Sequence, residues 1–294
     1  MSDPIVTGAI TKSAGVGSER SEAIDRGLLV RVLGTSADAL DETLRRYTEY
    51  RLRNVQAIVE RAEAKCHSPK DESIVNLRVA HVVLEDGSYC DDEIVASYLG
   101  GLLAGSRTPQ GRDDRAVTWS KVITGLSSLQ IRAHYLLYRE WAARLRIIAV
   151  YDLGVEAGRA QATIEISSGE FVKLLVYGSE VDENDAMSHA IGGLVRVGLL
   201  DDKFFYNDKL VKVMPSIMGL ELYGWAQGLP GLSPRRFASK AQLIDLEDAI
   251  PRLSSVTFPE VPERADATVD AGGKQVQVQV QRQAGRTRNR DSSG

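Results

Sequence analysis

Cysteines are too few in this sequence, and too far apart, to indicate a metal or redox site. The 294 residues include only Cys66 and Cys90, which lack the C-x-x-C spacing of zinc and redox motifs. Two thiols would also be a sparse disulfide framework for a chain of this length. We therefore expect a protein of the reducing cytoplasm.

Long apolar runs and a secretory signal are also missing. Apolar stretches such as 147–150 are far shorter than the ~20 residues of a membrane-spanning helix. The first twenty residues carry an acid early and have no continuous apolar core, so they do not fit the description of a signal peptide. These observations predict no transmembrane segment, no membrane partner and no secretion.

The charge balance gives no general attraction to nucleic acid. The formal net charge is −4, whereas a protein that binds phosphate through counterion release normally shows a basic surplus or a basic face. Any contact with nucleic acid must then be local. With 43% hydrophobic and 26% charged residues, the composition is that of an ordinary globular protein, so most of the chain is expected to fold.

Local signatures of catalysis are absent as well. The sequence has no G-x-S-x-G turn, and the glycine-rich segment 8–20 lacks the lysine–serine ending of a phosphate-binding loop. Cys66 neighbours His67, but no paired short spacing supports a zinc site. The acids within 180–185 could bind Mg²⁺, yet they precede a helix, where acids are favoured electrostatically. We expect no catalytic residue, no cofactor and no metal, and the sequence favours a protein that is not an enzyme.

A strong helical pattern fills the first half of the chain. Thr35 or Ser36 suits the N-cap of a long helix that ends before Pro69. Apolar residues recur along this helix at every third or fourth position and predict one buried stripe, formed by Leu40, Leu44, Tyr47, Leu52, Val55, Ile58, Val59 and Ala62. Acid–base pairs four residues apart would lie on its exposed face, namely Asp41/Arg45, Glu42/Arg46 and Glu49/Arg53.

Four further helices complete a helical unit. Periodicity predicts them over about 71–84, 91–106 and 116–126, and then from Ser127 or Ser128 through Trp141. Gly100 and Gly101 are predicted to permit a close approach between helices. The aromatic residues at helical positions, Trp119, Trp141, Tyr223 and Trp225, are interpreted as core anchors.

The pattern changes after Leu145. The β-branched clusters of 145–166 predict one or two strands, and 167–178 and 182–200 then predict two helices. In the second of these helices, Ala186, Ala190, Ile191, Leu194, Val195 and Val197 should point inward. Two alternating runs broken at Asn207-Asp208 predict a hairpin, followed by a last helix that begins at Ile217 or Gly219. Helix, helix, hairpin is the order of a winged-helix domain.

The predicted fold class is mainly α with a small β component, in which an N-terminal helical unit is followed by a winged-helix-like domain. The expected organisation is a flexible leader (1–20), a helical domain (21–145), a winged-helix-like domain with short strands (146–228), a turn-rich extension with one helix over about 238–253 (229–258) and a disordered basic tail (259–294).

Three helical segments together resemble a known family. RLRNVQAIVERAEAK (51–65), EIVASYLGGLLAGS (93–106) and WSKVITGLSSLQIRAHYLL (119–137) look like the Abi-alpha, or abortive infection alpha, family of bacterial proteins. The Arg-x-x-Asn helix, A-x-L-L-A-like segment and L-S-x-L-like turn of that family correspond here to 51–54, 98–104 and 126–129. Downstream, LVRVGLLDD and PSIMGLELYGWAQG resemble its leucine-glycine-leucine step and its terminal glycine-containing helix.

The resemblance spans about residues 40 to 228 and implies a bacterial origin and a role in defence against phage, in which infected cells stop growing or die. It implies no chemistry, because the family pattern carries no assigned catalytic residue. The strand-like segment 145–166 extends the usual junction between the helical and winged parts, which is a departure from the pattern.

Nucleic acid is the main alternative partner. Contacts would be made by Arg196, Lys203, Lys209 and Lys212, on the second helix of the winged part and its hairpin. The expected recognition helix, 184–197, exposes only His189 and Arg196 as possible basic groups. It also begins beside four acids that repel phosphate.

Three hypotheses for function follow. The leading one is a bacterial defence-associated, abortive-infection-like protein that acts through a protein partner or self-association. The second is a winged-helix DNA-binding transcriptional regulator, and the third is an unrecognised nuclease or hydrolase. A regulator needs a basic recognition face, an enzyme needs a convergent polar pocket, and an interaction protein needs an exposed apolar patch.

Overall fold

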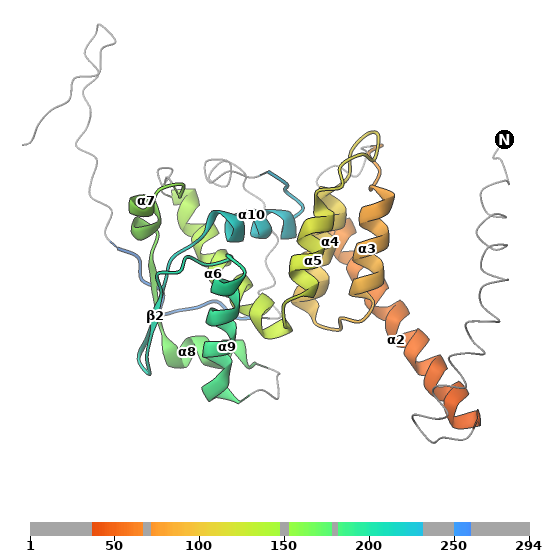
Figure 1. Cartoon of the computed structure of the whole chain (residues 1–294), viewed down its shortest axis with the longest axis horizontal. Helices are drawn as coiled ribbons and strands as arrows, with labels where there is room; N and C mark the ends of the chain where they lie inside the picture. Colours follow the sequence, from red (N-terminus) through yellow and green to blue (C-terminus); the bar gives the residue numbers. More distant parts are fainter. Residues whose placement is uncertain (1–36, 67–71, 148–152, 178–181, 232–249, 260–294) are drawn as a thin grey trace, which may run out of the picture. The chain divides into compact units, whose positions relative to one another are not determined.

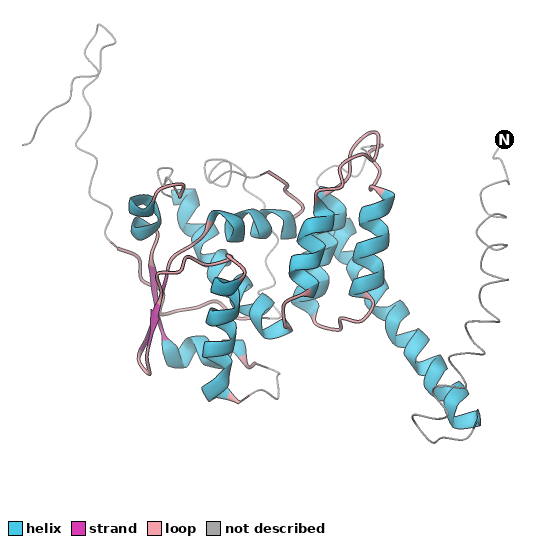
Figure 2. Ribbon diagram, in the orientation of Figure 1, coloured by secondary structure: helices cyan, strands magenta, loops and turns pink. Residues whose placement is uncertain are grey.

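The computed structural model describes residues 37–66, 72–147, 153–177, 182–231 and 250–259. This part of the chain is mainly helical with one small antiparallel sheet, as the sequence predicted (Figures 1 and 2). The expected leader and the basic tail from 260 onward lie outside the described residues, as does most of the predicted helix 238–253. The described residues 250–253 of that helix are not helical.

The five helices expected in the first half are confirmed. They are α2 (Ala37–Ala64), α3 (Leu77–Gly87), α4 (Glu93–Gly105), α5 (Ala116–Thr124) and α6 (Ser128–Ile147). α3 begins six residues later than predicted because the Asn76 side chain accepts hydrogen bonds from the backbone N–H groups of Arg78 and Val79. Ser127 caps α6 in a reciprocal box with Gln130, in which each side chain accepts a hydrogen bond from the backbone N–H of the other.

α4 is the most deeply buried helix of this group. Its buried residues follow one another without interruption from Ile94 to Leu103, and α2, α3, α5, α6 and α10 (Ile217–Ala226) all pack against it. The predicted close approach at its two glycines is confirmed. A Cβ atom on Gly100 would lie 2.8 Å from the Ile58 carbonyl oxygen of α2, and one on Gly101 would lie 2.1 Å from the Ala226 carbonyl oxygen of α10.

The prediction of a single buried stripe on α2 is wrong. α4 covers the face that carries Asn54 and Ile58, which are almost fully buried. Three residues assigned to the buried stripe, Tyr47, Leu52 and Val59, are 44%, 63% and 47% exposed. The buried face is therefore rotated relative to the apolar stripe, and part of that stripe has no covering among the described residues.

The exposed charges of α2 form a local ladder that partly follows the predicted one. Glu42 and Arg46 form the expected ion pair at 2.7 Å. Arg45 bridges Glu42 and Glu49 at 2.9 and 2.7 Å, so these acids are held by residues three and four positions away. Pairs of this kind support a helix locally and contribute little where solvent screens them.

The second half contains a short helix that the sequence did not predict, followed by the predicted elements. In order these are α7 (Glu156–Gln161), β1 (Ile164–Ser167), α8 (Ser168–Leu175), α9 (Glu183–Arg196), β2 (Phe205–Tyr206), β3 (Leu210–Val213) and α10. The strand order is β1-β3-β2 and all pairs are antiparallel. The hairpin expected around Asn207-Asp208 is confirmed.

Alternation along the strands separates the core from solvent. Ile164 and Ile166 of β1 lie opposite Val213 and Val211 of β3, and all four are fully buried. On the other face Glu165 lies opposite Lys212 and pairs with it at 2.7 Å. The four aromatic anchors predicted from the sequence, Trp119, Trp141, Tyr223 and Trp225, are also buried.

Residues 250–257 run from α6 to the outer edge of β1, which 255–257 line. Glu165 and Thr257 exchange two backbone hydrogen bonds of 3.0 and 2.9 Å, which satisfies part of the edge of the sheet. Arg139 of α6 donates to the carbonyl oxygens of Ile250 and Pro251. This segment therefore ties α6 to the sheet.

Gly101 in α4 and Gly192 in α9 have different surroundings, and substituting them tests the packing of α4 against α10. Gly101→Ala should lower the free energy of unfolding by about 1–3 kcal/mol, because its methyl group overlaps the backbone of α10. Gly192→Ala in α9 has nothing within 4 Å of the new methyl group and should raise it by up to about 1 kcal/mol. Urea unfolding of both variants makes the comparison. Equal effects of the two substitutions would contradict the close contact between α4 and α10.

Candidate functional site

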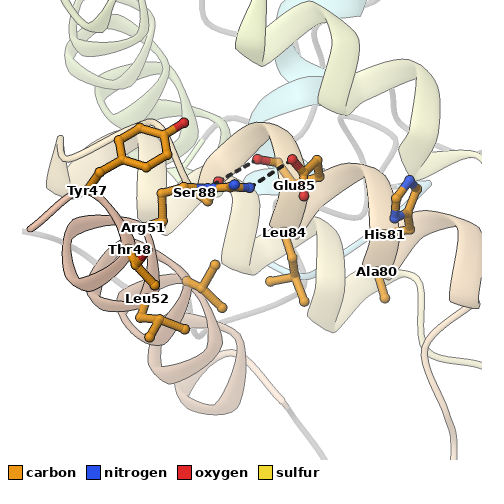
Figure 3. Close-up of a pocket in the computed structure, with 10 residues that line it drawn as sticks. Tyr47, Thr48, Arg51, Leu52, Ala80, His81, Leu84, Glu85 and Ser88 are labelled. Carbon is orange, nitrogen blue, oxygen red and sulfur yellow. Dashed lines mark hydrogen bonds and ion pairs between the residues drawn. The ribbon is translucent and has the colours of Figure 1, made fainter. Parts of the chain in front are cut away.

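A groove of about 450 Å³ lies between α2 and α3. Figure 3 shows side chains from both helices along it. The lining is mostly apolar with a polar end, and it consists of Tyr47, Thr48, Arg51, Leu52, Val55, Ala80, His81, Leu84, Glu85 and Ser88. The groove opens on the face of α2 that α4 leaves uncovered.

Arg51 forms the polar end of the groove. Its guanidinium carbon lies 4.6 Å from the ring centre of Tyr89 and 5.9 Å from that of Tyr47. It donates to the Ser88 hydroxyl at 2.9 Å and to the Glu85 carboxylate at 2.8 Å (Figure 3). Burial favours loss of its charge, but the hydrogen bond and charge of Glu85 outweigh this and raise the pKa of Arg51. The group is thus a fixed cation beside two aromatic rings.

The same part of α2 holds the end of α3 in place. Asn54, which is buried, donates from its amide nitrogen to the Ser88 carbonyl oxygen at 2.9 Å. Tyr50 donates from its hydroxyl to the Tyr89 carbonyl oxygen at 3.1 Å. Arg51 and Asn54, the two named positions of the Arg-x-x-Asn pattern, therefore satisfy acceptors at the end of α3 and act in the fold.

The apolar lining continues beyond the groove. Leu52 projects at 63% exposure, and Val59 lies two turns further along the same side of α2 at 47%. Leu77, at 86%, stands three and four residues before Ala80 and His81 of α3, which is the spacing of one helical face. Exposed apolar residues that adjoin in this way mark binding surfaces more often than isolated ones do.

The groove offers binding contacts and few reactive groups. His81 and Glu85 are its remaining titratable residues besides Arg51 and Tyr47, and Glu85 is engaged by Arg51. Within the described residues no group of three or more histidines, cysteines or carboxylates is placed to hold a metal ion. Cys66 and Cys90 are both free thiols. This surface is suited to recognising a protein through an apolar centre and a charged rim.

Lys65, just after α2, is a buried lysine that the sequence gave no reason to single out. Its ammonium nitrogen lies 2.5 and 2.6 Å from the Ser97 carbonyl and hydroxyl oxygens of α4 and 2.7 Å from the Ala226 carbonyl oxygen of α10. Burial, together with the smaller effect of the charge of Arg61, lowers its pKa to about 7. A neutral amine keeps all three contacts if it donates hydrogen bonds to the two carbonyl oxygens and accepts one from the Ser97 hydroxyl group.

His134 of α6 is the second buried titratable group. Its Nε2 donates to the Gly219 carbonyl oxygen at 3.0 Å, so Nδ1 accepts from the Tyr98 hydroxyl at 2.7 Å. Burial lowers the pKa of His134 to about 3, which keeps the ring neutral. This set of contacts joins α4, α6 and the start of α10, and it has the character of a satisfied core polar network.

A serine–histidine contact at the surface was also not predicted from the sequence. The Ser127 hydroxyl lies 3.0 Å from Nε2 of His189 in α9. The same oxygen accepts the backbone N–H of Gln130 as the cap of α6, and Gln130 donates to the His189 carbonyl oxygen. Within the described ranges no carboxylate orients the other ring nitrogen of His189. The contact joins α6 to α9, and it lacks the third member of a nucleophile–base–acid set.

The four residues predicted to contact nucleic acid differ in whether a carboxylate already pairs with them. Lys203 is paired with Glu156, and Lys212 with Glu165 at 2.7 Å. Arg196, in the last turn of α9, and Lys209, in the hairpin, are exposed. Of the described carboxylates none pairs with either of these two residues.

Comparison of the chain with protein-family models, curated proteins and solved structures finds no match in any of the three. Within the described ranges no helix has both the length and the apolar character needed to cross a lipid bilayer.

The buried amine of Lys65 predicts a dependence of stability on pH. Its pKa is about 7 in the folded chain and ordinarily 10.5, so between these values the unfolded chain binds the extra proton. The free energy of unfolding should therefore rise with pH above neutrality, at up to about 1.4 kcal/mol per pH unit. This gain in stability should disappear as the pH falls towards 7.

Urea unfolding of the wild type and of Lys65→Met between neutral pH and about pH 9 isolates this contribution, because other titrating groups are common to both chains. The wild-type stability should rise relative to that of the variant. Parallel profiles for the two chains would show that Lys65 stays charged in its buried position.

Proposed function

We propose that this chain is a bacterial defence-associated protein that acts through protein–protein contact at the groove between α2 and α3. The observation that carries the proposal is the uncovered apolar lining of the groove beside the fixed cation of Arg51. Arginine and tyrosine are the residue types most enriched where proteins bind each other tightly. The defence context rests on the resemblance of 51–65, 93–106 and 119–137 to the Abi-alpha family.

The geometry favours binding over catalysis at this place. Arg51 is held by four neighbours, so little side-chain freedom is lost when a partner covers it. Leu52 and Val55 offer apolar area beside it, and removal of this area from water would contribute about 25 cal/mol per Å². An ordered cation next to an apolar lining is the arrangement that favours a specific partner.

Phage challenge of bacteria that express the chain tests this function. The wild type should reduce plaque formation, and Leu52→Glu should weaken the protection roughly tenfold or more, since it places a charge at the centre of the apolar surface. Val155→Glu is the matched control, because Val155 is 51% exposed, immediately precedes α7 and does not line the groove.

Circular dichroism establishes that both variants keep their helix content. Absence of protection by the wild type across a broad phage panel would rule out the defence role. Undiminished protection by Leu52→Glu would rule out the groove as the surface through which it acts.

A second candidate function is DNA binding, and the arrangement of the second half supports it. β1 precedes the helix pair α8 and α9, the hairpin β2–β3 follows, and β1 pairs with β3. A winged-helix domain has its elements in this order. The rings of Phe204 and Tyr206 also stack at 6.1 Å on the hairpin, where Phe205 is 52% exposed, and aromatic residues of this kind can stack on bases.

Electrostatics place this candidate second. Glu156 and Glu165 already neutralise two of the four lysine and arginine residues that would contact phosphate. His189 is engaged by Ser127, which leaves Arg196 as the free basic group of α9 among the described residues. A phosphate-binding surface normally presents several unpaired cations.

Binding to a mixed double-stranded DNA library at low and moderate salt distinguishes the two candidates. If the second half binds DNA, Arg196→Glu should weaken binding and reduce its salt dependence by about one released ion. Arg112→Glu, in the exposed loop between α4 and α5, is the control. No binding at low salt would exclude the DNA-binding function, and equal losses in both variants would exclude α9 as the contact.

A further inference from the structure

A second pattern on α2 becomes visible once the buried face is known. Five residues follow the alternating four- and three-residue spacing of a coiled-coil seam, namely Thr48, Leu52, Val55, Val59 and Ala62. All five are exposed or half-buried, although the seam contains a leucine and two valines. The fully buried Asn54 and Ile58 lie on the neighbouring face, against α4. α2 therefore carries two faces suited to packing, and the described residues cover one of them.

The first described turns of α2 have almost no tertiary support. Residues 45–49 are all exposed, and Figure 1 shows the start of α2 extending past the ends of α3 and α4. α2 has 28 residues, a length of about 42 Å at 1.5 Å per residue. Most of the stability of a helix in a protein comes from packing of its apolar face. A long helix whose seam none of the described residues covers is therefore an incomplete packing unit.

We propose that a second copy of this chain covers the seam, with the two α2 helices packed antiparallel across a two-fold axis near residue 54. This inference rests on the proposed role of the groove as a protein-docking surface, and it names the partner. Leu52 of each copy would pack between α2 and α3 of the other, against Ala80 and Leu84, which line the groove. The same surface would then serve both partners, as a two-fold interface requires.

The charges beside the seam favour a second copy and set its direction. Arg45, Glu49, Gln56 and Glu63 run along the side of the seam that faces away from α4. Arg45 and Glu63 are each nine residues from position 54, so an antiparallel pair places the arginine of one copy beside the glutamate of the other, twice. A parallel pair would place arginine against arginine and glutamate against glutamate. Like charges at such positions disfavour a coiled coil.

Sedimentation of the full chain over a wide range of concentration tests the proposal. The wild type should form a dimer, and Leu52→Glu should weaken the association at least roughly tenfold, because it places a charge in the apolar seam. Val59→Glu should act in the same direction. Val155→Glu, a substitution at a valine just before α7 whose exposure is close to that of Val59, should leave the dimer unchanged.

A charge exchange tests the direction of the helices. Arg45→Glu alone should weaken the dimer by roughly fivefold, because it places a glutamate beside Glu63 of the other copy at two places in the interface. Adding Glu63→Arg to it should restore the association, because the pair is re-formed with its signs exchanged. A dimer that the double variant does not restore would overturn the antiparallel arrangement.

A wild-type chain that stays monomeric at every concentration would overturn the dimer and leave the groove to another segment or protein. A dimer that survives both seam substitutions would show that the copies meet elsewhere. Phage protection by a monomeric wild type would contradict only this inference, whereas a dimer without protection would contradict only the defence function.

Discussion

The absence of side chains at positions 100 and 101 of α4 allows two backbones to reach it, and the rest of the described chain depends on these contacts. α2 passes against Gly100 and the end of α10 passes against Gly101. The Ala226 carbonyl oxygen is then enclosed, and Lys65 supplies it with a donor at 2.7 Å. The three helices thus meet without an unsatisfied acceptor at Ala226. Because α10 follows the hairpin directly, this junction also attaches the second half of the chain to the first.

The same junction determines which surface of α2 is left for function. Contact at Gly100 requires Ile58 to face α4, and a rigid helix then turns Leu52 and Val59 about a quarter turn or more away. α3 approaches from the other side, but Arg51 and Asn54 hold its end so that a groove stays open between the two helices. The groove therefore follows from how α2 is fixed. Its apolar lining is a consequence of an apolar stripe wider than one neighbour can cover.

Sequence periodicity predicted the helices and strands well, but it predicted poorly which faces of these elements pack against each other. The helices, the hairpin and the close approach at Gly100 and Gly101 follow from local spacing and residue size, and both can be read from the sequence alone. The orientation of the stripe on α2 depends on which face meets α4, and this is set by residues far along the chain. Lys65 and the pairing of Lys212 with Glu165 also depend on contacts between distant segments. Two of the four candidate contacts with nucleic acid, Lys203 and Lys212, are paired with glutamates from distant segments, and such pairing leaves no sign in the spacing.

Several of the residues that resemble the Abi-alpha pattern hold helices together. Arg51 and Asn54 satisfy acceptors at the end of α3, and Ser127 with Gln130 caps α6 and reaches α9. The small residues of 98–104 allow the helices to touch. Arg51, Asn54, Ser127 and the two glycines therefore act in joining helices, so a likeness at these positions concerns the scaffold. The function we propose rests instead on the apolar lining of the groove and on the fixed charge of Arg51 at its end.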